Sequence, residues 1–447
     1  MTEQTRQADT KQYNPAGNPA SLRKFLETTH PVDVAAYLDN LPPDEAKEFL
    51  LKATPESQGK VFGYLKPDAQ IALAENLGRR RLADILTTMS ADDRADVFNR
   101  LEEGQRELLL PGLAQAERED LRRLAAYEEG TAGAIMTSGY ATLPPGITAR
   151  DAIKKLRLQA PDKETIYRAF VLDEEGRLIG ALRLADIILA RPNTKIKNIM
   201  EKDPISANLA DTQESVAQTL SRYDMLAVPV VDGGGVLYGI VTYDDALDAL
   251  EEEATEDFHK IGTVGKMSES VKDAGFWLLY RKRIGWLVLL VFGNLFSSAG
   301  IAFFEETITA YVALVFFLPL LIGSGGNAGA QAATLMVRAL ATGDVVMRDW
   351  AKMLWRELLV GGALAATMAL AITPISVMRG SYDIALVVAI TMMIVVILGS
   401  LIGMSLPFLL NKLRLDPATA SAPLITTVCD AIGVVTYFGV ASVILFQ

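Results

Sequence analysis

Five long apolar stretches follow Arg283, and they constrain this chain of 447 residues more than any other feature. They cover Ile284–Phe304, Thr309–Leu335, Leu358–Val377, Ile384–Leu410 and Ala420–Phe446. Each meets the ~20 residues that an α-helix needs to cross a hydrocarbon core about 30 Å thick. The sequence therefore predicts a membrane domain of five transmembrane helices at 281–447.

The basic residues beside these stretches predict their orientation. Arg281–Arg283 precede the first stretch, and further Lys and Arg residues lie in the loops after the second and fourth. The loop after the first stretch has none, and the loop after the third has only Arg379. Because basic loops stay on the cytoplasmic side, we expect a cytoplasmic N-terminal half and an outside C-terminus. The first 30 residues contain no apolar segment of a secretory signal.

The composition excludes several classes of protein. The 43 Lys and Arg against 54 Asp and Glu leave a net charge of −11, concentrated before Ile284, whereas a nucleic-acid partner would require a basic surface. A single Cys excludes a disulfide framework or a thiolate zinc site. The two histidines, His30 and His259, are far apart in the sequence. With no phosphate loop and no nucleophile beside a base, we expect no enzyme.

Asp430 is the polar residue that points most directly to function. It lies near the middle of the fifth stretch, where an Asp costs about 2.5–3.5 kcal/mol on membrane-insertion scales. No basic residue lies within any of the five stretches to pair with it. Asp430 can bond to a neighbouring helix, but a cation in an aqueous path is the more natural partner.

The second stretch contains PLLIGSGGNAGAQ, from Pro319 to Gln331. Its four glycines weaken the helix and let backbones approach closely, so helix packing explains some of them. Asn327 and Gln331 are four residues apart, one above the other on a helix face.

The fifth stretch adds further oxygen atoms near Asp430. Thr426 and Thr427 bear hydroxyl groups, and Pro423, like Pro319, can free nearby carbonyls. Oxygen ligands with one carboxylate and neither sulfur nor imidazole suit a hard cation such as Mg²⁺. Cys429 is read as a small apolar residue, because its side chain points about 100° away from that of Asp430.

The soluble half contains an internal repeat. Phe170–Ile187 matches Pro229–Ala246 at a constant offset of 59, and the upstream Ile135-Met136 matches Ile199-Met200. The paired residues are Asp173 with Asp232, Gly176 with Gly235, Gly180 with Gly239, and Asp186 with Asp245. Each copy predicts a strand, a Gly turn, a strand and a helix. The repeat resembles a tandem pair of CBS domains, which are usually regulatory and often bind adenine nucleotides. A purely structural, dimerising pair is the alternative.

The first part of the chain is predicted to be helical. NLPPDEA (40–46), YLKPDAQ (64–70) and TMSADDR (88–94) recur every 24 residues, and each is a turn that opens a helix. The pattern is typical of a helical superhelix, whose hand remains open. The fold class is therefore multidomain. We expect a disordered tail at 1–19, an all-α superhelical N domain at 20–130, α/β tandem CBS domains at 131–250, a connecting helix at 251–280 and the membrane domain.

An acidic segment joins the two halves. Asp248–Asp257 holds six carboxylates in ten residues. On a helix Asp245, Asp248, Glu252 and Glu256 fall within a stripe about 80° wide. Such a face can simply be solvated. Because it precedes the membrane, however, divalent cations bound between it and another acidic surface would lock the two together, and the surfaces would separate without cations.

These features together resemble the MgtE family of bacterial magnesium channels and transporters over essentially the whole chain after residue 20. The strings that carry the resemblance are EATEDFHKIG, PLLIGSGGNAGAQAATLMVRALATGD, LPFLLNKLRLDPATAS and TTVCDAIG. The family implies a homodimer in the bacterial inner membrane, with its pore at the subunit interface between spans two and five. It implies a Mg²⁺-selective channel for magnesium uptake, closed by Mg²⁺ bound to the cytosolic domains and to the acidic plug helix.

The resemblance also implies which residues bind Mg²⁺. Asp430 would hold a hydrated ion in the pore, assisted by Asn327 and by carbonyls near Ala418 and Ala422, where Ala422 stands in place of an Asn in some members. The sensor residues would be Asp245, Asp248, Glu253, Glu256 and Asp257, with Glu214 and Asp224 in the second CBS domain. One of Asp92, Asp93 or Asp96 would ligate a sensor ion and so bridge the helical N domain to Asp245.

Two points remain open at this stage. ATP is implied at the CBS pair, yet Arg168 stands where a family member places an aromatic residue. An ion-coupled carrier for divalent cations would use the same broken spans and the same Asp430. A membrane-anchored sensor without transport is the third alternative.

Overall fold

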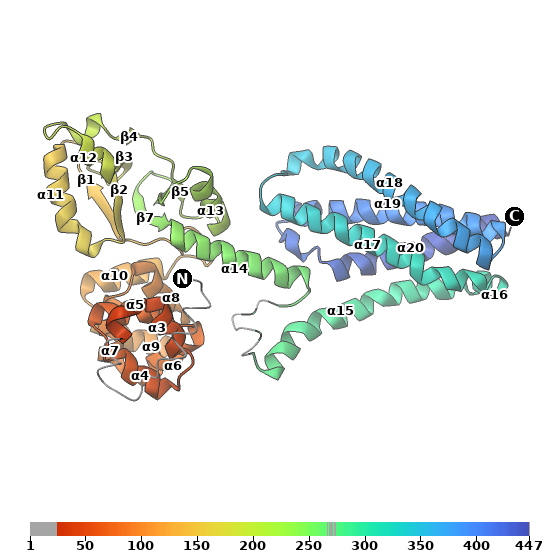
Figure 1. Ribbon diagram of the computed structural model, residues 1–447, viewed down its shortest axis with the longest axis horizontal. Coiled ribbons are helices and arrows are strands. Elements are labelled where there is room, and N and C mark those ends of the chain that lie inside the picture. The colour runs from red at the N-terminus through yellow and green to blue at the C-terminus, as the bar shows by residue number, and fades with distance from the viewer. Residues whose placement is uncertain (1–24, 266, 268–270, 272–273, 447) are drawn as a thin grey trace. The chain divides into compact units, whose positions relative to one another are not determined.

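The computed structural model describes residues 25–446 apart from 266, 268–270, 272 and 273. The chain divides into two compact units, Met1–Glu252 and Glu253–Gln447 (Figure 1). The tail predicted at 1–19 and the first residues of the predicted N domain lie outside the described residues.

Short helices in two alternating series begin the first unit. One series comprises α3 (Pro31–Leu38), α5 (Pro55–Gly63), α7 (Arg79–Thr87) and α9 (Glu103–Leu109), and the other α4 (Pro43–Leu50), α6 (Pro67–Asn76), α8 (Ala91–Arg100) and α10 (Gln115–Leu124). Within each series the helices start 24 residues apart and neighbours pack on one another. Four of the helices begin with Pro, whose missing N–H costs nothing in a first helical turn. The predicted 24-residue spacing is confirmed as a two-helix repeat.

Two small sheets follow, one in each half of the internal repeat. The first has the order β1-β2-β3-β4 and contains β1 (Tyr140–Leu143), β2 (Thr165–Leu172), β3 (Leu178–Arg183) and β4 (Glu201–Lys202). The second has the order β5-β6-β7 and contains β5 (Ala207–Asn208), β6 (Ala227–Val231) and β7 (Leu237–Thr242). In each sheet the first pair of strands is parallel and the next is antiparallel. The flanking helices are α11 (Ala149–Gln159), α12 (Leu184–Leu189), α13 (Gln213–Arg222) and α14 (Tyr243–Ile261).

The two halves of the repeat contact each other reciprocally. The Leu178 N–H donates to the Gly235 carbonyl at 2.9 Å, and the Leu237 N–H donates to the Gly176 carbonyl at 3.1 Å. A Cβ atom on Gly180 would lie 2.7 Å from the sulfur of Met200, and one on Gly239 would lie 2.7 Å from that of Met136. The sequence repeat is therefore a pseudo-twofold pair in which each half covers a glycine of the other.

The second unit contains five helices that are long and apolar enough to cross a membrane. They are α15 (Phe276–Phe303), α17 (Ala313–Ala341), α18 (Trp350–Arg379), α19 (Tyr382–Lys412) and α20 (Ala422–Leu445). The number matches the prediction, but α15 and α18 begin earlier than expected because their first turns are polar or aromatic. A short helix, α16 (Glu305–Ala310), precedes α17, and a 3₁₀ turn, η6 (Pro417–Thr419), precedes α20.

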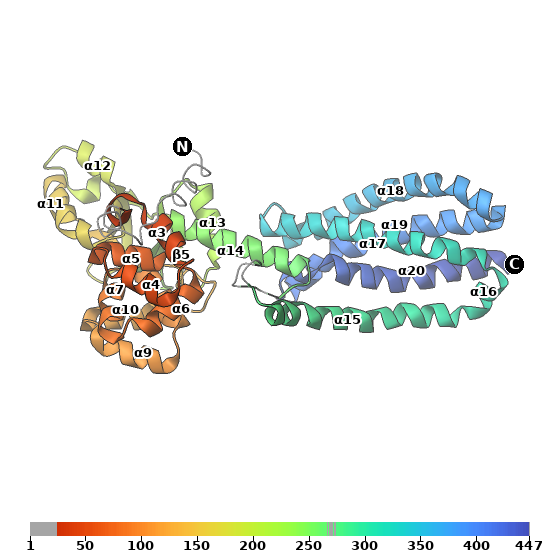
Figure 2. The same cartoon turned by 60° about the horizontal axis from the view of Figure 1, so that its bottom comes forward.

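Close backbone contact between α17 and α19 organises this bundle (Figure 2). A Cβ atom on Gly399 would lie 2.2 Å from the Gly325 carbonyl oxygen, and one on Gly403 would lie 2.0 Å from that of Gly329. Both helices therefore use a pair of glycines four residues apart, which is how membrane helices gain packing contact without a hydrophobic driving force. Gly323, by contrast, has no atom within 4 Å of its Cβ position.

This crossing predicts opposite effects for two glycine substitutions. Gly403→Ala would force α17 and α19 apart, and overpacking of this kind costs roughly 1–3 kcal/mol. Gly323→Ala adds a methyl group in open space and removes backbone freedom, so it should be neutral or slightly stabilising. Thermal unfolding of both variants in detergent tests the crossing, and equal Tm values would contradict it.

Candidate cation sites

Asp430 lies inside α20, one of the five long apolar helices. The Ser421 hydroxyl caps this helix by accepting from the Leu424 N–H. The carboxylate is half-buried, and it has neither a hydrogen bond nor an ion pair with any residue that the structure describes. An isolated carboxylate at this depth is unfavourable without a cation or water.

Small residues of α17 face α20 just before Asp430. A Cβ atom on Gly326 would lie 3.0 Å from the Thr426 methyl group, and one on Gly329 would lie 3.3 Å from the Cys429 sulfur. Cys429 is buried in this contact, as its prediction as a small apolar residue requires. Asn327 and Gln331 of α17 are exposed.

One expectation about the fifth span was wrong. Pro423 does not free carbonyls within the span, because it lies in the first turn of α20, where proline continues the chain into the helix. Its own carbonyl accepts the hydroxyls of Thr426 and Thr427, each at 2.9 Å. Pro319 does lie inside α17.

The last turn of α14 is fastened to the segment before α20. Lys260 lies 2.6 Å from the Glu256 carboxylate and donates a second bond to Asp416. Asp416 in turn caps η6 by accepting from the Ala418 N–H at 2.8 Å. Ile261 packs against an apolar cluster of Ala333, Val337, Ala418, Ala420, Ile425 and Cys429. The Lys260 ammonium therefore ties the acidic helix to the chain that leads into α20.

Carboxylates of α8 and of the first half of α14 repel one another in the first unit. Burial, reinforced by Asp245 and Asp93, raises the pKa of Asp92 well above its usual range, and one Asp92 oxygen is buried without a hydrogen-bond partner among the described residues. Burial raises the pKa of Asp245 to about 7, with Asp244, Asp93 and Glu164 adding repulsion. Such shifts mark charge that a cation would relieve.

The other predicted sensor residues lie on several helices, and their electrostatic environments differ. Burial raises the pKa of Asp96 to about 6, although the Arg100 cation opposes that shift. Burial and Asp416 together raise the pKa of Asp257 to about 6. Glu214 lies in the first turn of α13, where it accepts from Gln218 at 3.3 Å. Asp224 follows that helix with a positive φ of 50°. Glu253 and Asp248 lie on α14.

Among the described residues, no three His, Cys, Asp or Glu side chains are grouped closely enough to hold a metal ion. Mg²⁺ usually keeps several waters and binds through only one or two carboxylates. Asp430 with Asn327 and the carbonyls near Ala418 and Ala422 therefore stays a predicted ligand set.

Sequence reasoning missed three groups that the structure brings to these sites. Glu164 and Asp244 add negative charge beside Asp93 and Asp245. Asp416 forms an ion pair with Lys260. Asp244 could have been found, because it adjoins the predicted stripe. Glu164 and Asp416 are isolated in sequence and become relevant only through folding.

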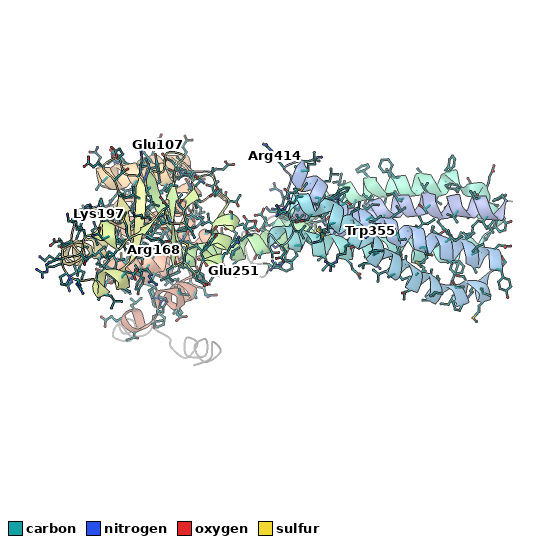
Figure 3. All side chains as sticks on the ribbon, turned by 90° about the horizontal axis from the view of Figure 1, so that it is seen from above. Glu107, Arg168, Lys197, Glu251, Trp355 and Arg414 are labelled. Atoms are coloured by element: carbon teal, nitrogen blue, oxygen red, sulfur yellow. The ribbon has the colours of Figure 1, made fainter. Side chains whose placement is uncertain are left out.

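Arg168 of β2 bears on nucleotide binding at the CBS pair. Its guanidinium lies 2.7 Å from the Glu201 carboxylate of β4. Arg168 is labelled in Figure 3. β2 thus carries a paired cation at this position.

A bundle of five long apolar helices with an unpaired carboxylate, joined through an acidic helix to two α/β repeats, has the architecture of a membrane transporter with soluble domains. Three protein-family models match the sequence. The MgtE divalent cation transporter family matches residues 318–440, and the MgtE intracellular N domain family matches residues 29–130. The CBS domain family matches residues 132–193 and 196–252. The chain is 37% identical to the magnesium transporter MgtE of Thermus thermophilus over 96% of both chains. It is 31% identical to that of Bacillus subtilis over 95% of this chain and 94% of the relative.

The chain therefore belongs to the MgtE family, and it is a magnesium transporter with cytosolic N-terminal domains. A crystal structure titled as the cytosolic domain of the Mg²⁺ channel MgtE in complex with ATP is also similar. It is 37% identical and covers 52% of this chain and 95% of its own, with a TM-score of 0.50. The predicted family, fold class and substrate ion are confirmed.

The raised carboxylate pKa values predict that acid stabilises the metal-free protein. The pKa values of Asp96 and Asp245 are higher in the folded protein than in the unfolded chain. Their contribution to stability is therefore fully present at a pH below the unfolded-state pKa values, and it is lost as the pH rises through the folded-state values of about 6–7. In EDTA, Tm of the full-length protein should fall between roughly pH 5 and pH 8, and Mg²⁺ should restore it at the alkaline end.

Two substitutions sharpen this test. Asp245→Asn should flatten the pH profile, whereas Asp68→Asn, an exposed carboxylate in the first turn of α6, should leave it unchanged. A profile equally steep in all three proteins would contradict the assignment.

Lys260 predicts a second metal-dependent effect. Lys260→Met leaves Glu256 and Asp416 without their shared cation, so Tm in EDTA should fall and the stabilisation by Mg²⁺ should increase. The pair is partly exposed, so its own contribution is on the order of 1 kcal/mol or less. Lys52→Met, at an exposed position in the turn after α4, is the charge-matched control, and identical Mg²⁺ dependence in both variants would rule out the role of Lys260.

Proposed function

We propose that this protein is a Mg²⁺-selective channel for magnesium uptake, closed by Mg²⁺ bound to its cytosolic domains and to α14. The observation that carries the proposal is Asp430, a half-buried carboxylate in an apolar helix with no basic partner among the described residues. A hydrated Mg²⁺ ion is the partner that such a group accommodates best, since Mg²⁺ loses its water reluctantly. Uptake would be driven by the membrane potential, worth ~4.6 kcal/mol per 100 mV for a divalent ion.

Gating follows from the charge of α14 and its neighbours. At high cytosolic Mg²⁺, bound ions would neutralise Asp92, Asp93, Asp245 and Asp248 and hold the cytosolic domains compact. The last turn of α14 would then close the pore, which is supported by the packing of Ile261 before α20. At low Mg²⁺, repulsion between the carboxylates would release this turn. Glu253, Glu256 and Asp257 of α14, with Glu214 and Asp224, complete the proposed sensor set.

A homodimer belongs to the same proposal. Asn327 and Gln331 are exposed on a single protomer, and a pore between α17 and α20 of two copies would cover them and bring Ala418, Ala422 and Asp430 to one path. Exposed apolar residues on the CBS pair also recur at the repeat offset of 59, as Tyr167 with Leu226 and Ile188 with Leu247. A twofold interface would bury both pairs. We place this dimer in the bacterial inner membrane with its C-terminus outside.

An adenine nucleotide is proposed at the CBS pair. The similar cytosolic domain of the Mg²⁺ channel MgtE was crystallised in complex with ATP. In this chain a base entering beside β2 would meet the paired guanidinium of Arg168, which can stack on a planar base.

Single-channel recording from proteoliposomes tests the proposal. We expect discrete openings that disappear when Mg²⁺ on the cytosolic side rises from micromolar to roughly 10 mM. Asp430→Asn should abolish the Mg²⁺ current, and neutralising Glu256 and Asp257 should weaken closure. Asp383→Asn, in the first turn of α19, is the matched control and should conduct normally.

The outcomes separate the alternatives. Mg²⁺ flux without unitary currents would sink the channel and favour an ion-coupled carrier that uses Asp430. Flux that survives unchanged in Asp430→Asn would remove that residue from the transport path.

A further inference from the structure

The first two turns of α15 lie outside the apolar part of that helix. α15 has 28 residues and is therefore roughly 42 Å long, because each residue rises about 1.5 Å. The apolar segment from Ile284 to Phe303 already covers a hydrocarbon core about 30 Å thick. Phe276–Arg283 must therefore lie at the level of the lipid headgroups. Since the matched N domain is intracellular and α15 is the first candidate span, this is the intracellular leaflet.

Three aromatic rings surround the start of α15. Phe276, Trp277 and Tyr280 are 73%, 70% and 47% exposed. Their rings nevertheless contact one another, with centroids 5.4–6.4 Å apart. Aromatic residues of this kind gather at the membrane interface, where their apolar bodies contact lipid and their polar ends contact water.

Three consecutive cations follow these rings. Arg281, Lys282 and Arg283 have no ion-pair partner among the described residues. On a helix Arg281 lies one turn after Trp277, and Arg283 one turn after Tyr280, so each of these arginines shares a helix face with an aromatic residue. The Lys282 carbonyl accepts from the Gly265 N–H at 2.9 Å, which holds the chain after α14 against this turn.

We propose that this aromatic and basic collar, Phe276–Arg283, binds the headgroup phosphate of an anionic phospholipid in the intracellular leaflet. A planar guanidinium donates two parallel bonds to a phosphate, and the neighbouring rings cover the glycerol backbone. These three cations, without an ion-pair partner among the described residues, make an anionic lipid preferable to a zwitterionic one. The collar itself contains no acidic residue. α15 packs mainly on α20 (Figures 1 and 2), which leaves the rest of its surface open to lipid.

Lipid binding by the full-length protein tests this site independently of transport. Native mass spectrometry in mixed phosphatidylglycerol and phosphatidylcholine would give the preference for each lipid. The triple variant Arg281→Gln, Lys282→Gln, Arg283→Gln should lose the preference for phosphatidylglycerol by roughly tenfold or more, since each juxtamembrane cation contributes several-fold. Soluble glycerol phosphate should not compete, because it lacks the acyl chains that place a phosphate at the collar.

A matched control exists elsewhere in the same chain. Arg79, Arg80 and Arg81 are also three consecutive exposed cations, at the start of α7 in the N domain. Their replacement by Gln makes the same charge change and should leave the lipid preference unaltered. A collar variant that binds phosphatidylglycerol as the native protein does, or a control that loses binding equally, would overturn the proposal.

If the collar variant does not fold, the salt dependence of the native protein's preference for phosphatidylglycerol tests the proposal. Exposed charges are screened strongly between 50 and 500 mM salt, so the preference should fall several-fold over that range. A preference independent of salt would refute the assignment to Arg281–Arg283.

Discussion

Carboxylate charge without a basic counterpart governs both units of this protein. In the membrane helices, Asp430 lies where a lone negative charge is unfavourable and has no cationic side chain to offset it. In the cytosolic domains, burial and mutual repulsion raise the pKa values of Asp92 and Asp245. The same excess of negative charge therefore underlies both the Mg²⁺ site proposed in one unit and the response to Mg²⁺ proposed in the other.

The glycines give this electrostatic arrangement its geometry. Gly325 and Gly329 bring α17 against Gly399 and Gly403 of α19 at backbone contact. α17 also packs along α20, the helix that bears Asp430. A Cβ atom at any of these four glycines would lie too close to a neighbouring helix, so the helices would have to move apart. In the CBS pair, Gly180 and Gly239 likewise make room for Met200 and Met136, so that two repeats form one body.

Much of this architecture could be predicted from the sequence because its signals are periodic. The five spans, the 24-residue helical repeat and the offset of 59 between the CBS copies each depend on spacing alone. Span ends were less accurate, since aromatic and charged residues such as Trp277 and Trp350 continue a helix without looking apolar. Pro423 was misjudged because its effect depends on its position within the helix, which sequence alone did not locate.

By itself, the sequence determined the inventory of this protein: five apolar helices, two related α/β repeats, an acidic helix and a single carboxylate deep in an apolar span. These follow from local spacing and composition, which folding does not alter. Which distant groups meet depends on the folded chain. It placed Glu164 beside Asp93 and Asp245, and Lys260 between Glu256 and Asp416. Such pairings depend on how helices cross, and that depends on contacts between residues far apart in the chain.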